Sequence, residues 1–118
     1  MRKGTAWETA IVRFLNDNGV PHAERRAKNG MKDRGDIAGI PGVVIEAKNE
    51  RAIALASYLA EAEAERINDG ADLGVAWVKR RGKSSPGDGY VVMTGATLVQ
   101  LLAAAGYIAT PAPLTRDV

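Results

Sequence analysis

The chain has 118 residues, of which 46% are hydrophobic and 25% charged, a size and composition typical of one globular domain. It contains no cysteine, which excludes disulfides, thiolate zinc sites, iron–sulfur clusters and a cysteine nucleophile. No apolar stretch approaches the roughly 20 residues of a membrane span, and no signal-peptide core follows the N-terminus. We therefore expect a single domain over residues 1–118 in the cytoplasm, and the alanine-rich composition favours a bacterial or phage-infected host cell.

The net charge of +2 hides an uneven distribution along the chain. Residues 1–51 carry ten Lys or Arg against seven Asp or Glu, and residues 76–118 carry five against two. Residues 52–75, in contrast, carry one basic residue against five acidic ones. Two basic stretches thus flank an acidic one, which suits either a basic face for a polyanion or charges that merely solvate a small globule.

The first predicted element is a helix over residues 5–18, because apolar residues recur there at the spacing of one helical face. Thr5 followed three residues later by Glu8 resembles a capping box, and Asn18-Gly19 favours a helix end. The apolar face comprises Trp7, Ala10, Ile11, Phe14 and Leu15.

An edge strand over 20–27 and a polar loop over 28–35 follow, and then the clearest local signal in the chain. Two β-prone runs, 36–40 and 43–48, flank Pro41-Gly42, which suits the central positions of a type II turn. We therefore predict an antiparallel hairpin here.

The second half of the chain predicts a helix, two strands and a short final helix, with Gly70 and Gly106 as helix stops. The complete order, α-β-β-β-α-β-β-α, predicts an α/β fold with a mixed five-stranded sheet flanked by helices. The tail over 109–118, which contains two prolines, is expected to fray. The predicted ranges are 51–69 for the helix, 73–79 and 90–94 for the strands, 81–89 for the loop between them, and 97–105 for the final helix.

Strand alternation places Glu46 and Lys48 side by side on one face of the predicted strand 43–48. A two-residue hairpin loop would pair Asp36 with Ala47, whereas a one-residue bulge would bring Asp36 beside Glu46. Two carboxylates beside a lysine suit Mg²⁺ and the activation of water for phosphodiester hydrolysis. The alternative is a solvated strand face with a weak surface ion pair.

Two stretches of the chain resemble known nucleases. The runs Gly35-Asp36-Ile37-Ala38 and Val44-Ile45-Glu46-Ala47-Lys48 resemble the PD-(D/E)XK nuclease motif, with Gly35 where that motif usually has proline. The start, Lys3-Gly4-Thr5-Ala6-Trp7-Glu8, resembles the first helix of archaeal-type Holliday junction resolvases. The resemblance implies a restriction-endonuclease-like fold and a metal-dependent endonuclease that resolves four-way junctions by paired nicks. A nuclease for flaps, nicks or duplexes, a non-catalytic DNA-binding module of the same fold, and a regulatory protein with an acidic partner-binding helix remain alternatives.

The resemblance also implies roles for individual residues. Asp36 and Glu46 would bind Mg²⁺, or Mn²⁺ in its place, with the carbonyl of Ala47 and with Glu8. Lys48 would be the catalytic lysine. Either Arg25 or Arg26 would contact DNA near the scissile phosphate.

Further basic residues suit phosphate contacts, with a solvated loop as the alternative. A homodimer would match the two-fold symmetry of a four-way junction. Its surface is expected on the helix 51–69 or at the apolar end of the chain. The phosphate-contacting candidates are Lys3, Lys28, Lys32, Arg34 and the run 79–83, and the apolar end comprises Leu98, Leu101, Leu102, Tyr107 and Ile108.

Overall fold

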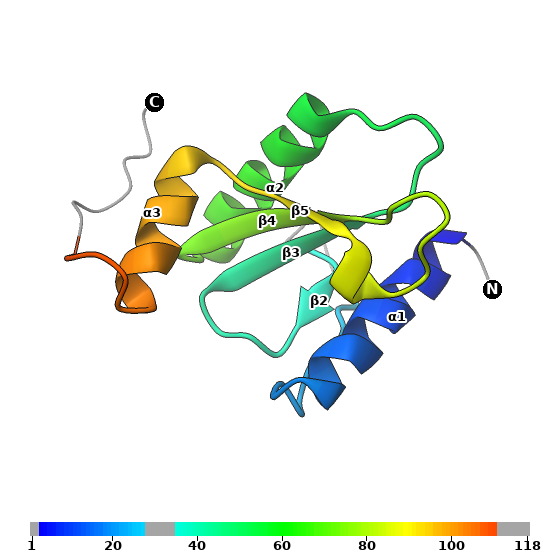
Figure 1. The fold of residues 1–118 in the computed structure, drawn as a ribbon, viewed down its shortest axis with the longest axis horizontal. Coiled ribbons are helices and arrows are strands. Elements are labelled where there is room, and N and C mark those ends of the chain that lie inside the picture. The colour runs from blue at the N-terminus through cyan, green and yellow to red at the C-terminus, as the bar shows by residue number, and fades with distance from the viewer. Residues whose placement is uncertain (1–2, 28–34, 111–118) are drawn as a thin grey trace.

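The computed structural model describes residues 3–27 and 35–110, which form an α/β fold around one mixed sheet of five strands (Figure 1). The strands lie in the order β1-β2-β3-β4-β5; β3 and β4 are parallel, and the other neighbouring strands are antiparallel. The predicted fold class is confirmed at this level. The elements are α1 (Lys3–Asp17), β1 (Glu24–Arg25), β2 (Ile37–Ala38), β3 (Val43–Lys48), α2 (Leu55–Asp69), β4 (Leu73–Val78), the 3₁₀ turn η1 (Pro86–Asp88), β5 (Tyr90–Val92) and α3 (Gly95–Ala104).

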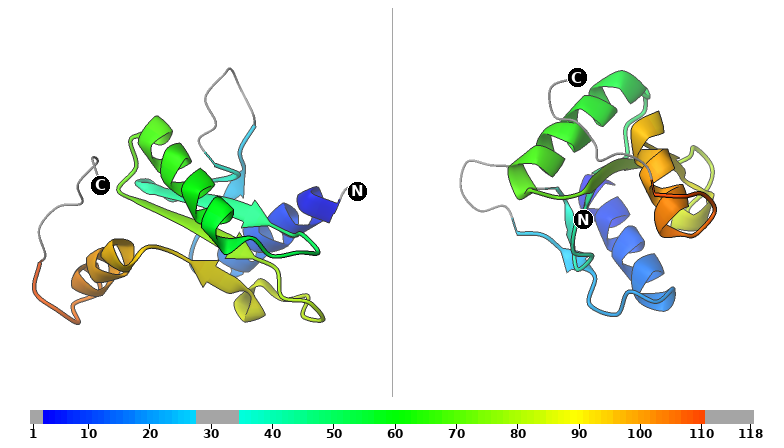
Figure 2. Two further views of the ribbon diagram at one scale, coloured as in Figure 1. Left: turned by 90° about the horizontal axis from the view of Figure 1, so that it is seen from above. Right: turned by 90° about the vertical axis from the view of Figure 1, so that its left-hand side faces the viewer.

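Helix α2 connects the two parallel strands at the centre of the sheet. The register runs from Val43 opposite Leu73 to Lys48 opposite Val78, so β3 and β4 end together. Helix α2 packs on one face of these strands and α1 lies on the opposite face (Figure 2). The carboxyl ends of both strands therefore lie at the same end of the sheet, between the two helices.

The apolar face of α1 supplies one half of the core. Trp7 and Ile11 pack against Ile37, Ile45 and Val75 of the sheet, as the helical spacing predicts. The indole N–H of Trp7 also donates to the carbonyl of β4 residue 77 over 3.0 Å, which ties the helix to the central strand. The second cluster, between α2 and the sheet, comprises Tyr58, Ala76 and Val78.

The predicted capping box at the start of α1 is wrong. The helix already includes Lys3 and Gly4, so Thr5 lies within its first turn and not at the N-cap. Glu8 forms an ion pair with Arg25 of β1. The predicted end of the helix is confirmed, because Gly19 adopts a φ of +96°, which favours glycine.

The predicted hairpin is confirmed, including its turn. The amide of Val43 donates to the carbonyl of Ile40 over 3.1 Å, and Gly42 has a φ of +81°, as the third position of a type II turn requires. Ile37 pairs with Ile45, one residue away from the register of a two-residue loop.

Several predicted helices and strands are longer than the observed ones. The edge strand predicted over 20–27 is paired only at Glu24–Arg25, because the chain turns between Val20 and Ala23. Helix α2 begins at Leu55 and not at residue 51, while its end at Gly70, with a φ of +67°, agrees with the prediction. Of the predicted tail, residues 111–118 lie outside the described residues. Among the described residues, no helix is long and apolar enough to span a membrane.

Candidate active site

Two buried acidic residues flank the pair of residues that joins β2 to β3 near the end of β3. Ile37 of β2 pairs with Ile45 of β3, so Asp36 precedes this pair on its own strand and Glu46 follows it on the other. Asp36 is 4% exposed and Glu46 6%. The Ile37–Ile45 pair has the one-residue shift that the predicted bulge requires, and both acids lie next to this pair along their strands.

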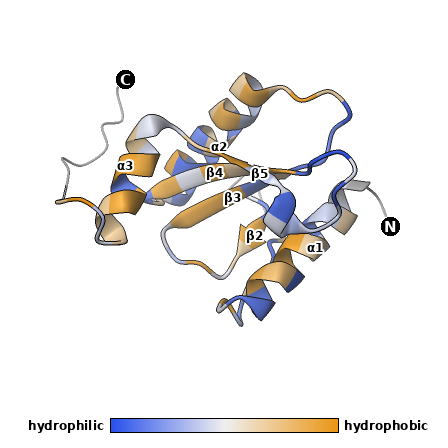
Figure 3. Ribbon diagram, viewed as in Figure 1, coloured by the Kyte–Doolittle hydropathy of each residue, from blue (hydrophilic) through white to orange (hydrophobic). Residues whose placement is uncertain are grey.

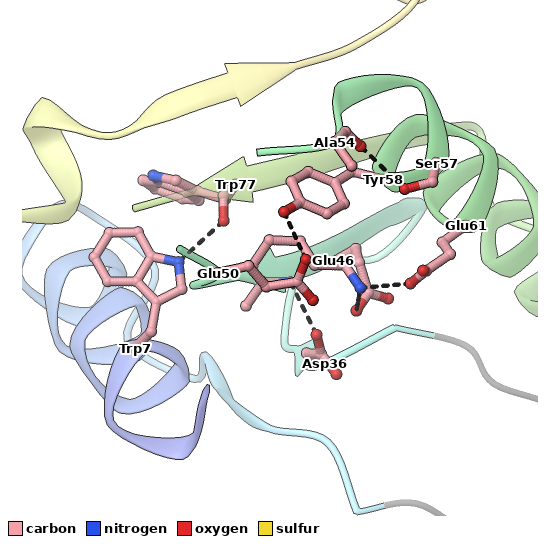
Figure 4. Close-up of polar contacts among 11 residues, drawn as sticks. Trp7, Asp36, Glu46, Glu50, Ala54, Ser57, Tyr58, Glu61 and Trp77 are labelled. Carbon is pink, nitrogen blue, oxygen red and sulfur yellow. Dashed lines mark hydrogen bonds and ion pairs between the residues drawn. The ribbon is translucent and has the colours of Figure 1, made fainter. Parts of the chain in front are cut away.

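Main-chain hydrogen bonds to the segments on both sides hold the backbone of Asp36. Its amide donates to the carbonyl of Ile45 over 2.9 Å, and its carbonyl accepts from the amide of Arg26 over 2.8 Å. Its Oδ2 accepts a hydrogen bond from the amide of Ala47 over 2.8 Å (Figure 4). The carboxylate is thus held between neighbouring strands by main-chain contacts, which set its position more firmly than flexible side-chain partners would.

Glu46 carries a buried oxygen without a partner among the described residues. Its Oε1 lies 3.9 Å from Nζ of Lys48, but its Oε2 accepts no hydrogen bond in the described part of the chain. A buried carboxylate oxygen left unsatisfied is costly, and a bound cation is one of the few groups that offset this cost. The donor set of hard oxygens beside Asp36 therefore fits Mg²⁺ or Mn²⁺.

The main chain of Ala47 faces the side of β3 on which Asp36 lies. Its amide donates to Asp36, and in a strand the N–H and C=O of one residue face the same neighbouring strand. The carbonyl of Ala47 therefore also faces the β2 side. The two carboxylates and this carbonyl are the residues that would hold the metal.

Lys48 is held over α2 by two contacts. Its Nζ lies 2.6 Å from Oε2 of Glu61 and 5.3 Å from the centre of the Tyr58 ring (Figure 4). The Lys48 side chain is 14% exposed, whereas the Glu61 side chain is 52% exposed. The ammonium therefore lies between a buried carboxylate, Glu46, and a solvated one, Glu61.

Tyr58, whose ring lies beside the Lys48 ammonium, is itself held by two contacts. Its hydroxyl donates to Oε1 of Glu50 over 2.7 Å and lies 3.1 Å from the carbonyl of Ala52. The hydrogen bond to Glu50, together with burial of the ring, raises the pKa of Tyr58 above its usual 10.0. The phenol stays neutral near pH 7 and fixes the loop between β3 and α2.

Glu8 is engaged elsewhere in the structure. Its Oε1 accepts from Nε of Arg25 over 3.0 Å, and no cluster of three or more Asp, Glu or His able to hold a metal is found within residues 3–27 and 35–110. The role of Glu8 as a metal ligand stays a prediction. Its ion pair does place Arg25, one of the two candidate DNA contacts, beside it at the sheet edge.

The other predicted DNA contacts divide into two groups. Arg26 lies half-buried with Nη1 3.9 Å from Oδ1 of Asp69 at the end of α2, whereas Arg25 is 47% exposed at its side chain. An exposed guanidinium is the better placed of the two for DNA. Of the remaining candidates, Lys28, Lys32 and Arg34, and the side chain of Lys3, lie outside the described residues, whereas the run 79–83 lies in the loop that follows β4.

Sequence reasoning missed Glu50, Tyr58 and Glu61. Tyr58 and Glu61 are three residues apart in α2 and so share one face of the helix, which is a signal that was available. The sequence does not show which way that face points, because its direction depends on how α2 crosses the sheet after β3.

Comparisons of the chain with protein-family models, with curated proteins and with solved structures give no match.

Proposed function

We propose that this chain is a Mg²⁺-dependent DNA endonuclease of the restriction-endonuclease-like fold, which Mn²⁺ would also support. The observation that carries the proposal is the buried pair Asp36 and Glu46, with Lys48 3.9 Å from Glu46, at the carboxyl end of a central strand. Both carboxylates are buried, and Oε2 of Glu46 has no hydrogen-bond partner among the described residues, which supports a cation at this place.

The residues divide the chemistry among them. Asp36, Glu46 and the carbonyl of Ala47 would hold the metal, which supplies Lewis-acid polarisation of a phosphate oxygen and lowers the pKa of water. Lys48 presents an ammonium beside Glu46, where it orients the attacking water or offsets charge that develops on the scissile phosphate. The outcome is hydrolysis of a phosphodiester bond.

The four-way junction is the proposed substrate, by resemblance to the archaeal-type Holliday junction resolvases. Cutting it takes two sites related by a two-fold axis, which a symmetric homodimer supplies. The apolar end of the chain supports such a dimer, because α3 packs only lightly on the rest of the fold (Figure 1) and most of its residues are hydrophobic (Figure 3). The exposed apolar residues here are Leu98, Val99, Tyr107 and Ile108, and the edge strand β5 adds Tyr90 and Val91.

The direct test is incubation of the protein with a labelled four-way junction, a linear duplex, a nicked duplex and a flap, each with and without Mg²⁺. Paired nicks in the junction only, dependent on Mg²⁺, support the full proposal. Cleavage of the other substrates with equal efficiency keeps the nuclease and removes the junction preference. Binding without cleavage in Mg²⁺, and equally when Mn²⁺ replaces it, identifies a DNA-binding module and contradicts the proposal.

A further inference from the structure

A pocket of about 390 Å³ lies between two loops that follow the parallel strands. One loop follows β3 and the other follows β4, and the two run side by side at the carboxyl edge of the sheet (Figures 1 and 2). Its volume is at the lower end of the roughly 300–1,000 Å³ of ligand sites, so it suits a segment of about one nucleotide. The pocket is lined by Asn49, Glu50, Arg51, Ile53, Lys79, Arg80, Arg81 and Gly82.

Four cations line this pocket against one carboxylate. The carboxylate, Glu50, already accepts the hydroxyl of Tyr58, while the side chains of Arg51 and Arg81 belong to exposed residues. Arg80 is half-buried, with its guanidinium 5.3 Å from the centre of the Tyr90 ring. The excess of positive charge selects an anion, and guanidinium groups suit phosphate oxygens in particular.

The start of α2 adds to the positive electrostatic potential near the pocket. The helix has 15 residues, begins directly after the pocket loop at Leu55, and has no side-chain cap at its N-cap residue, Ala54. The first turn also carries no acidic residue. Uncapped N–H groups at the positive end of a helix dipole favour a nearby anion.

The pocket adjoins the candidate active site through the backbone. Lys48 is the last residue of β3, Asn49 is the first residue of the pocket lining, and the amide of Lys79 donates to the carbonyl of Lys48 over 2.9 Å. The strand ends thus fix the pocket relative to Lys48, with no flexible linker between them.

We propose that this pocket binds a backbone phosphate of the DNA, with Arg51 and Arg81 as the principal contacts. The inference rests on the proposed function and adds to it a built phosphate subsite beside the reacting centre. Contacts of this kind position the strand and carry no base information, so their removal weakens binding about equally on DNA of different sequence.

An exposed arginine outside the pocket provides a matched control. Arg81 lines the pocket, whereas Arg13 of α1, also exposed, does not. Binding of a fluorescent four-way junction is measured by anisotropy in EDTA over 50–300 mM KCl, for the wild type, for Arg51→Gln and Arg81→Gln singly and together, and for Arg13→Gln. Circular dichroism and the unfolding midpoint of each variant confirm that the fold is retained.

Removing one phosphate-binding cation should reduce the slope of log K against log salt by about 0.9. We expect that reduction for Arg51→Gln and for Arg81→Gln, about twice that reduction for the double variant, and none for Arg13→Gln. Slopes that are unchanged in the pocket variants, or reduced equally in Arg13→Gln, overturn the pocket assignment. Because this assay contains no Mg²⁺, it decides the subsite separately from cleavage. If the wild type binds the junction but never cuts it, the proposed nuclease function is refuted, and the salt slopes still decide whether the pocket binds phosphate. If the wild type does not bind the junction, both proposals are refuted.

Discussion

The two ends of the sheet depart from ordinary burial in opposite directions. At the carboxyl end of β3, the carboxylates of Asp36 and Glu46 are 4% and 6% exposed. At the other end, α3 leaves Leu98 48% exposed and is followed by Tyr107 at 79% (Figure 1). A folded chain usually buries apolar side chains and solvates charges, so each end reverses one half of that rule.

The two ends therefore suit different kinds of partner. Buried acids with an unsatisfied oxygen fit a cation, which offsets their desolvation. Exposed apolar groups on a lightly packed helix and a sheet edge fit a protein surface. Under the proposed function, the first end would bind a metal and DNA, and the second would bind another copy of the chain.

The largest expected effect is on the carboxylate end. Glu46→Gln and Asp36→Asn each should lower cleavage of a four-way junction by about 10³-fold or more, because the metal stabilisation that they remove amounts to several kcal/mol. Binding of the junction in EDTA should change little. In EDTA the Glu46→Gln protein should unfold at the same temperature as the wild type or higher, since the substitution removes a buried charge.

The exposed acid Glu24 of β1 provides the control for these two variants. Glu24→Gln should retain full cleavage. Full cleavage by Glu46→Gln would contradict the assignment of the metal site to this end of the sheet.

The next effect separates the two partners of Lys48. Lys48→Gln should lower cleavage by about 10²-fold, in line with the loss of a group that positions water or stabilises charge in the transition state. Glu61→Gln should change cleavage less than about threefold and stability by less than about 1 kcal/mol, because the Glu61 side chain is 52% exposed. Single-turnover rates and urea unfolding of both variants measure this difference. Equal losses of cleavage would move Glu61 into the catalytic machinery.

A third prediction addresses the apolar end. Leu98→Lys on α3 should weaken dimerisation by more than about tenfold, as expected for a charge placed in an apolar interface, without unfolding the monomer. Ile67→Lys on α2, where the original side chain is 52% exposed, is the matched control for the other surface considered for the dimer. Sedimentation velocity over a range of concentrations measures both. A dimer weakened by Ile67→Lys alone would place the interface on α2.

The smallest effect concerns the loop that separates the site from α2. Because the pKa of Tyr58 is raised in the folded protein, its neutral phenol contributes stability that is fully present below pH 10 and is lost as pH rises through the raised value. Tyr58→Phe should cost about 1 kcal/mol at pH 8, for the missing hydrogen bond to Glu50, and its stability should fall less steeply above pH 10. Urea unfolding at pH 8 and pH 10.5 provides the comparison. A penalty that grows above pH 10 would contradict this role.

Local patterns predicted the parts of the fold that depend on neighbours in the chain. The spacing of Trp7 and Ile11 identified the buried face of α1, and Pro41-Gly42 identified the hairpin turn. Strand alternation placed Glu46 and Lys48 on one face, where their ion pair now lies.

The parts that depend on distant packing could not be predicted in this way. The choice between two registers for Asp36 required the geometry of the whole hairpin, since a shift of one residue is compatible with the same sequence. The contacts of Lys48 with Tyr58 and Glu61 depend on how α2 crosses the sheet. Similarly, the pairing of Glu8 with Arg25 joins elements 17 residues apart.

Whether two carboxylates from neighbouring strands hold a divalent cation can be measured directly. Mn²⁺ binding to the DNA-free protein, followed by electron paramagnetic resonance, compares the wild type with Glu46→Gln, Asp36→Asn and the control Glu24→Gln. We predict saturable binding to the wild type and to Glu24→Gln, and its loss in the other two variants. Equal binding by all four proteins, or none by the wild type, would contradict the account.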